Sequence, residues 1–271
     1  MKLLRNLFLF SLTILSATTA LAFDGAVPQD GNEFRWQGVI APGKALEVKG
    51  VNGEVRAEAA TGNEVEVVAL KRAWRSDPQS VTVKLVEHAG GVTVCAVYPQ
   101  RDGQPGHCAP GRGGQNAHDN DVKVEFIVRL PAGVNFIGRT VNGNVTAKAL
   151  GGNVDASTVN GSIKVSTAGH AQARTVNGGI SVACGRADWN EALEFNTVNG
   201  SIELSLPESA QTAIQARTVN GSITSELPLF VQGEFNARRL NGVIGSGAES
   251  RSSRQLKLET VNGSIRVSRT L

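Results

Sequence analysis

The feature of this sequence that most constrains its fold is a four-residue phrase, TVNG, which recurs through the second half of the chain. The asparagines from Asn142 to Asn262 follow one another at intervals of 18, 17, 22, 21, 21 and 21 residues. Self-similarity at a period of about 20 residues is typical of architectures in which short units stack on one another. The phrase begins at Thr140, Thr158, Thr175, Thr197, Thr218 and Thr260, with a variant RLNG at Arg239 and an earlier VNG at 51–53.

Each repeat has the pattern of two strands joined by a bend. Apolar and polar residues alternate before NG, as in LKLET, and again after it, as in ISVAC. A period of two indicates strands. Asn-Gly between such strands is also a hairpin signal, so meandering hairpins are the alternative. Recurrence of the whole phrase favours stacking, because identical side chains then lie about 4.8 Å apart and can bond to their copies. We predict an all-β, single-domain β-solenoid resembling a parallel β-helix, with about seven TVNG-type rungs.

The positions of the phrase predict different roles. Counted in steps of two along the strand, threonine and asparagine fall on the same face as the apolar residues. We expect them to form a structural ladder. We expect the glycine to supply a left-handed backbone after the asparagine. The valines have the opposite parity, and we expect them to turn inward, since an exposed apolar stripe signals a binding surface or an aggregation hazard. The predicted ladder residues are Asn142, Asn160, Asn177, Asn199, Asn220, Asn241 and Asn262, with Thr140, Thr158, Thr175, Thr197, Thr218 and Thr260.

The first half of the chain is also rich in strand patterns. No low-complexity linker separates it from the repeats, and the early VNG indicates diverged rungs. At the start, a basic region, an apolar stretch and an ALA sequence are typical of a cleaved signal peptide. We therefore predict a signal peptide at 1–22 and one solenoid domain at 23–271, with diverged strands at 33–137, a loop at 98–121 and regular repeats at 138–271.

Three cysteines accompany this export signal. Cys95 and Cys108 flank a loop, and in an oxidising compartment we expect a disulfide between them. The alternative is a metal site, because His107, His118, Asp119 and Asp121 lie in the same stretch as Cys108, but closed zinc sites have tighter paired spacing. We therefore interpret the stretch as a loop that a disulfide holds. Cys184 is expected to be a buried apolar residue.

The lead ending in VEFIVRLPAGVNFIGRTVNGNV, followed by serial TVNGSI units, resembles the bacterial “putative adhesin” family over about residues 40–271. The resemblance implies an exported β-strand-repeat solenoid of unknown function, with a surface or envelope role in adhesion or envelope stress. It transfers no catalytic residues, because the family has none agreed. The cysteine-containing loop at 98–121 departs from the family pattern.

No residue pattern predicts catalysis. Glycoside cleavage needs paired carboxylates and calcium binding needs acidic clusters, yet the carboxylates of the repeats are scattered. Neither a nucleophile elbow nor a phosphate loop occurs. We predict a protein that is not an enzyme, with no catalytic, metal or cofactor-binding residues and no cofactor. A carbohydrate-active lyase or hydrolase on a β-helix is the alternative. We expect His170 to be solvated, and Trp36, Trp74 and Trp189 to be core or cap residues.

The balance of 27 basic and 24 acidic side chains bears on the partner. Phosphate recognition needs a concentrated basic face, so nucleic acid is not expected. No segment after the signal peptide has the apolar length of a membrane span, so we expect no stable transmembrane anchor. We predict a periplasmic or cell-surface binding or structural module whose partner is a protein or an envelope polysaccharide. We also expect self-association through the C-terminal strand edge. An envelope-stress or signalling component acting through a partner protein is a further alternative.

Overall fold

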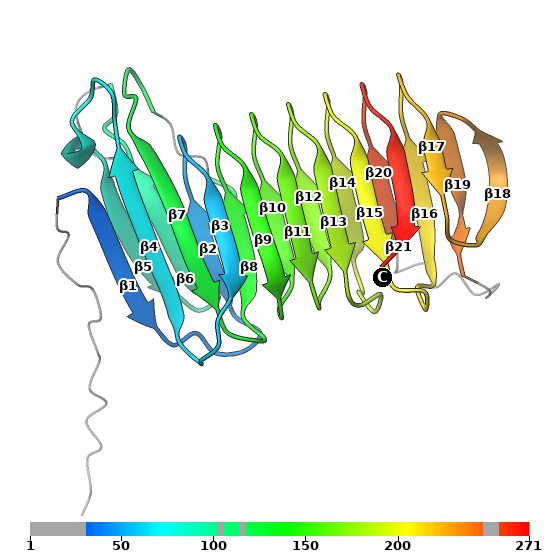
Figure 1. Ribbon diagram of the computed structural model, residues 1–271, viewed down its shortest axis with the longest axis horizontal. Coiled ribbons are helices and arrows are strands. Elements are labelled where there is room, and N and C mark those ends of the chain that lie inside the picture. Colours follow the sequence, from blue (N-terminus) through cyan, green and yellow to red (C-terminus); the bar gives the residue numbers. More distant parts are fainter. Residues whose placement is uncertain (1–30, 102–103, 105, 114–116, 246–254, 271) are drawn as a thin grey trace, which may run out of the picture.

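The computed structural model describes residues 31–101, 104, 106–113, 117–245 and 255–270. This part of the chain forms two long β-sheets that lie face to face (Figure 1). Its helical structure is limited to a single turn, η1 (Pro78–Ser80), and no described helix has the length and apolar character of a membrane span. The all-β solenoid predicted from the repeats is confirmed. The signal peptide expected at 1–22 lies outside the described residues.

The first sheet contains ten strands. In spatial order they are β1 (Glu33–Gly38), β4 (Val65–Arg72), β7 (Lys123–Leu130), β3 (Val55–Ala59), β9 (Val145–Leu150), β11 (Ile163–Thr167), β13 (Ile180–Cys184), β15 (Ile202–Leu206), β21 (Ile265–Arg269) and β17 (Ile223–Ser225).

The second sheet contains eleven strands. Their spatial order is β18 (Leu229–Asn236), β19 (Arg239–Ile244), β16 (Thr212–Arg217), β20 (Gln255–Glu259), β14 (Ala192–Asn196), β12 (Ala171–Arg174), β10 (Val154–Ser157), β8 (Asn135–Arg139), β2 (Ala45–Lys49), β6 (Gly91–Val97) and β5 (Thr82–His88).

A regular rung consists of a strand in the second sheet, the TVNG bend and a strand in the first sheet. The bends form the row of tight loops along the upper edge of Figure 1. Neighbouring rungs pair in parallel with like residues opposed, so that Ile163 faces Ile180 and Val165 faces Val182. Alternate side chains are buried between the sheets. The period-two pattern therefore produces one continuous apolar core along the column.

The order of the rungs differs from the order of the repeats in the chain. Strand β21 lies between β15 and β17, and β20 lies between β14 and β16. The last rung of the chain is thus inserted inside the column. We expected the C-terminal strand to leave an open edge for self-association, and this expectation is wrong because β21 has a parallel neighbour on each side.

The RLNG variant also departs from the prediction. Asn241 lies within β19, which pairs antiparallel with β16 on one side and with β18 on the other. Asn241 faces Gln215 across the β16–β19 pair, so it contributes nothing to the ladder of bends. The available sequence signal was the leucine at 240, which replaces the valine found in the other repeats.

Antiparallel strands close both ends of the parallel column. At the N-terminal end, β1 and β4 extend the first sheet and β5 extends the second, and at the other end β19 and β18 extend the second sheet. Terminal units that differ from the internal repeats are common in stacked architectures. Between β6 and β7 the loop at 98–121 takes the place that a TVNG bend has in other rungs.

Candidate functional site

The asparagines of the bends form a continuous chain of side-chain amides. Each Nδ2 donates to the Oδ1 of the preceding rung at 2.7–2.9 Å. The spatial order is Asn52, Asn142, Asn160, Asn177, Asn199, Asn262 and Asn220. Although the side chains after Asn52 are exposed, each amide between the two ends of the row is held by both neighbours, which fixes the bends in register.

The threonines lie beneath this row and are buried, with exposed fractions of 3–6%. They do not bond to one another. Each Oγ1 donates to the carbonyl oxygen of the glycine in the neighbouring bend, as from Thr175 to Gly161 at 2.9 Å and from Thr158 to Gly143 at 2.8 Å. Their hydroxyl groups therefore satisfy buried carbonyl oxygens that the strand ladders leave unpaired.

The glycine of the bend is required for a reason that the sequence did not indicate. In this row only Gly53 has a φ in the left-handed region, at 127°, so the expected left-handed backbone is wrong for the later bends. A Cβ atom at Gly161 would instead lie 2.0 Å from the carbonyl oxygen of Gly143. Close approach of consecutive bends, and not backbone handedness, excludes a side chain there.

Most valines of the bends point outward, so the expectation that they turn inward is wrong for these rungs, although Val141 is half-buried and packs against the core. Five of them have exposed fractions of 39–45% and follow one another along the bend edge. We call this surface the valine ridge; in spatial order it consists of Val159, Val176, Val198, Val261 and Val219. At its N-terminal end Val51 is only 4% exposed, and the stretch containing Asn120 lies beside it. The ridge is therefore an uncovered apolar edge that runs along the regular rungs.

A disulfide joins Cys95 to Cys108 and holds the loop against the outer face of the second sheet. Beneath the loop, Lys49 is buried and donates from Nζ to the carbonyl oxygens of Ala109 at 2.6 Å and Gly113 at 3.1 Å. Burial lowers the pKa of Lys49, while the charge of Glu47 opposes this effect. The loop thus covers charged side chains.

Glu47 is the centre of this covered network. Its Oε2 accepts from Thr93 Oγ1 at 3.1 Å and from the Gly111 amide at 2.9 Å, and its Oε1 accepts from Arg139 Nε at 3.1 Å. Arg139 also binds Asp155 Oδ2 at 3.2 Å. Sequence reasoning missed this network because Glu47 alternates with apolar residues, which is the pattern of a solvent-facing strand position.

Two of the residues considered as metal ligands serve other roles. Cys108 is in the disulfide, and Asp121 accepts the backbone amides of the 74–76 turn. These bonds, with the Ser76 hydroxyl, lower the pKa of Asp121 to about 2. Neither His118 nor His107 belongs to a group of three or more possible metal ligands within the described chain. Cys184 is a buried free thiol, and burial raises its pKa to about 11.

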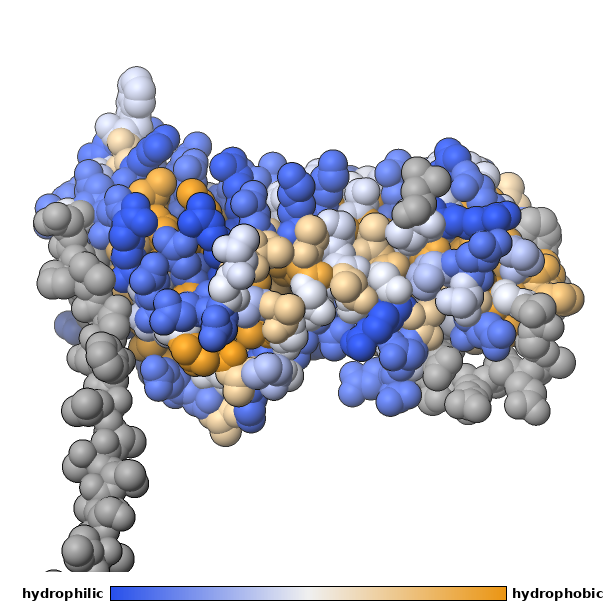
Figure 2. Space-filling view, turned by 60° about the horizontal axis from the view of Figure 1, so that its bottom comes forward, coloured by the Kyte–Doolittle hydropathy of each residue, from blue (hydrophilic) through white to orange (hydrophobic). Residues whose placement is uncertain are grey.

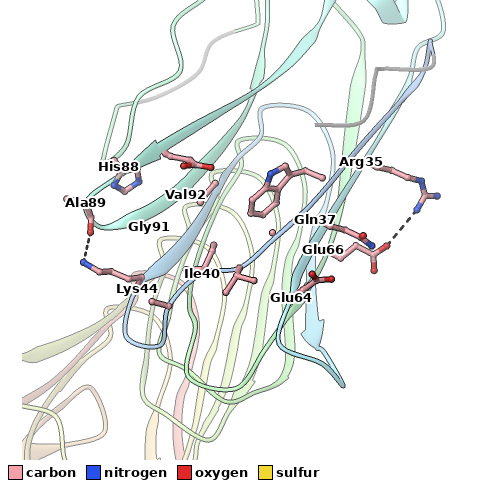
Figure 3. Close-up of a pocket in the computed structure, with 15 residues that line it drawn as sticks. Arg35, Gln37, Ile40, Lys44, Glu64, Glu66, His88, Ala89, Gly91 and Val92 are labelled. Carbon is pink, nitrogen blue, oxygen red and sulfur yellow. Dashed lines mark hydrogen bonds and ion pairs between the residues drawn. The ribbon is translucent and has the colours of Figure 1, made fainter. Parts of the chain in front are cut away.

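A cleft of about 870 Å³ opens at the N-terminal end, between β1 and the β5–β6 turn (Figure 3). Glu64 and Glu66 lie on one side and Lys44 and His88 on the other, with Ile40 between them. Val39, which lines the cleft, is exposed, and Figure 2 shows apolar side chains among hydrophilic ones at this end.

Polar groups of this cleft already have partners. Glu66 pairs with Arg35 at 3.8 Å and with Arg129 at 2.8 Å, and Lys44 donates to the carbonyl oxygen of Ala89. His88 contacts Thr93 Oγ1 through Nε2 at 3.0 Å and accepts the Gly90 amide through Nδ1 at 3.2 Å. These polar groups of the cleft are thus paired within the protein.

Comparison with known proteins gives a family and several solved structures with low sequence identity. The family described as Toastrack DUF4097 matches residues 44–268. A search of curated proteins finds no match. The chain is 13% identical to a “putative cell adhesion protein” from Clostridium sporogenes, with a TM-score of 0.45 and coverage of 87% of this chain and 99% of the other. It is 11% identical to a “putative adhesin” from Bacteroides fragilis, with a TM-score of 0.37 and coverage of 88% and 97%. For a “putative lipid binding protein” from Parabacteroides distasonis the identity is 10%, the TM-score 0.26 and the coverage 89% and 98%.

Proposed function

Because the chain belongs to the Toastrack DUF4097 family, whose model spans its solenoid, we propose that it is an exported, non-catalytic binding module of the cell envelope. The proposal takes residues 23–271 as one domain. The observation that carries it is the valine ridge, because contiguous exposed apolar surface on a protein of this kind marks an interaction site. The disulfide supports export, since such bonds persist in oxidising compartments.

The construction of the bend edge fits a binding role. Amide-to-amide bonds hold the asparagines beside the ridge, and buried threonine hydroxyls hold the bends from beneath. The valines are therefore presented on a rigid backbone at a repeat of about 4.8 Å. A rigid surface loses little conformational entropy on binding. An apolar ridge of this kind favours a protein partner over a polysaccharide, whose surface is mostly hydroxylated.

The test compares two pairs of lysine substitutions, one on the ridge and one on a neighbouring strand. Val176→Lys with Val198→Lys places charge on the ridge, while Ser181→Lys with Ala183→Lys places the same charge on the outward face of β13. We expect saturable binding of the wild-type protein to isolated cell envelopes, abolished when the envelopes are treated with protease. The ridge pair should weaken binding at least about tenfold, and the β13 pair should leave it unchanged.

Equal binding by the two lysine pairs would refute the role of the ridge. The non-catalytic assignment is tested separately, by incubating the purified protein with peptidoglycan and with acidic and neutral polysaccharides, with and without calcium. Turnover of any of these that a single carboxylate substitution abolishes would overturn it.

A further inference from the structure

The part of the chain that leads from β12 through β13 to β14 is irregular. The interval from Asn177 to Asn199 is 22 residues, against 17 for the preceding rung, and the additional residues lie between β13 and β14. Strands β12 and β14 pair only at Ala173–Phe195 and Arg174–Asn196, whereas β10 and β12 pair at four positions. The two strands are thus unpaired toward their N-terminal ends, beside the longer connector.

A cavity of about 420 Å³ lies at this irregularity. Asp155 from β10, Gln172 from β12, and Trp189 and Glu191 from the connector line it, together with His170. Trp189 is buried, and His170, which we expected to be solvated, is half-buried. The ring of His170 packs edge-on against Trp189, with centroids 6.5 Å apart and an interplanar angle of 62°.

Unsatisfied polar atoms are concentrated at this cavity. Five buried side-chain nitrogen and oxygen atoms in the described chain have no hydrogen-bond partner, and three of them belong to residues that line it. They are Asp155 Oδ1, His170 Nδ1 and Trp189 Nε1. A buried polar group without a partner costs about 1–3 kcal/mol, and native proteins keep few of them. The N-terminal cleft is different, because the ring nitrogens of His88 and the ammonium of Lys44 have partners within the protein.

The unpaired atoms define the chemistry that would satisfy them. Trp189 Nε1 can only donate a hydrogen bond, and Asp155 Oδ1 can only accept one. The other oxygen of the Asp155 carboxylate, Oδ2, accepts from Arg139 at 3.2 Å. Burial lowers the pKa of His170, the charge of Arg186 adds to this, and Asp188 and Glu191 oppose it. A neutral imidazole offers either a donor or an acceptor at Nδ1, depending on its tautomer.

Charge distinguishes the classes of ligand. Asp155 and Glu191 line the cavity, and no lysine or arginine does so. An anionic ligand would therefore meet carboxylates, while the nearby arginines are already paired, Arg139 with Asp155 and Arg186 with Asp188. Hydroxyl groups each donate and accept, and thus match a site with both a donor and an acceptor.

We propose that this cavity binds one neutral sugar unit of an envelope polysaccharide. The inference adds a ligand to the proposed binding role, but it uses a different surface from the valine ridge. Loss of one site therefore leaves the other intact, and the two proposals fail independently.

The test is isothermal titration calorimetry of the purified protein with maltotriose, cellotriose and tri-N-acetylglucosamine, and with trigalacturonate as the acidic comparison. We expect one neutral trisaccharide to bind at a single site and trigalacturonate not to bind. Trp189→Phe keeps the ring but removes the N–H donor, and His170→Gln removes the imidazole; each should weaken binding at least about tenfold. Trp74→Phe is the control, since Trp74 is 92% exposed and does not line the cavity.

The melting temperature of each variant distinguishes loss of the site from loss of the fold. If Trp189→Phe lowers the melting temperature, the conclusion rests on His170→Gln. The proposal is overturned if none of the three neutral trisaccharides binds at millimolar concentration, or if folded His170→Gln binds as tightly as wild type. It is also overturned if trigalacturonate binds as tightly as the neutral sugars.

Discussion

Two adjacent glycines provide a direct test of how the rungs pack. A Cβ atom at Gly178 would lie 2.1 Å from the carbonyl oxygen of Gly161, about 1.3 Å short of the 3.4 Å at which ordinary contact begins. At Gly179 the nearest atom would be the carbonyl oxygen of Ser201 at 3.5 Å, which is ordinary contact. Gly178→Ala should therefore force two bends apart, and Gly179→Ala should not.

The magnitude follows from the bonds that cross this gap. The Gly161 amide donates to the Asn177 carbonyl at 3.0 Å, and the Asn177 amide donates to the Val159 carbonyl at 2.8 Å. A displacement of about 1.3 Å takes such a bond beyond hydrogen-bonding distance. Overpacking costs about 1–3 kcal/mol and each lost bond about 1 kcal/mol. We expect Gly178→Ala to lower the free energy of unfolding by about 3–5 kcal/mol.

Urea unfolding followed by circular dichroism measures both variants. Gly179→Ala should remain within about 0.5 kcal/mol of wild type, as most surface substitutions do. Equal stabilities of the Gly178 and Gly179 variants would refute the argument from close approach. A Gly178→Ala protein with wild-type stability would show that the bends can separate without cost.

Further predictions concern other parts of the fold. The pKa of Asp121 is lowered to about 2, so its contribution to stability is present above its ordinary pKa of 3.8 and is lost as the pH falls toward 2. Asp121→Asn should therefore reduce stability at pH 7. It should also flatten the acid-unfolding curve between about pH 4 and 2, measured by fluorescence. Replacing Cys95 and Cys108 by alanine should cost about 3 kcal/mol, and unchanged thermal unfolding would contradict this. Thr175→Val should cost about 1–2 kcal/mol because the Gly161 carbonyl loses its donor, whereas Thr175→Ser should restore most of it in urea titrations.

The sequence by itself determined the repeating unit. Alternating apolar residues on both sides of each NG specify two strands, and their inward side chains require a second sheet to cover them. The recurring asparagine was sufficient to predict an amide ladder, because identical polar side chains at one bend position satisfy one another only when stacked. The close spacing of Cys95 and Cys108 around a loop was likewise enough to indicate their pairing.

The tertiary structure alone decided which rung stacks on which. Near-identical bends fit one another in any order, so the sequence carries no local signal that places Asn262 between Asn199 and Asn220. That order depends on the antiparallel β18–β19 pair, which occupies the outer edge of β16 and leaves its other edge to β20. The outward valines and the cavity at Trp189 were likewise decided by the tertiary structure. The first follows from how the chain turns at each bend, and the second from a mismatch between neighbouring rungs that no single repeat contains.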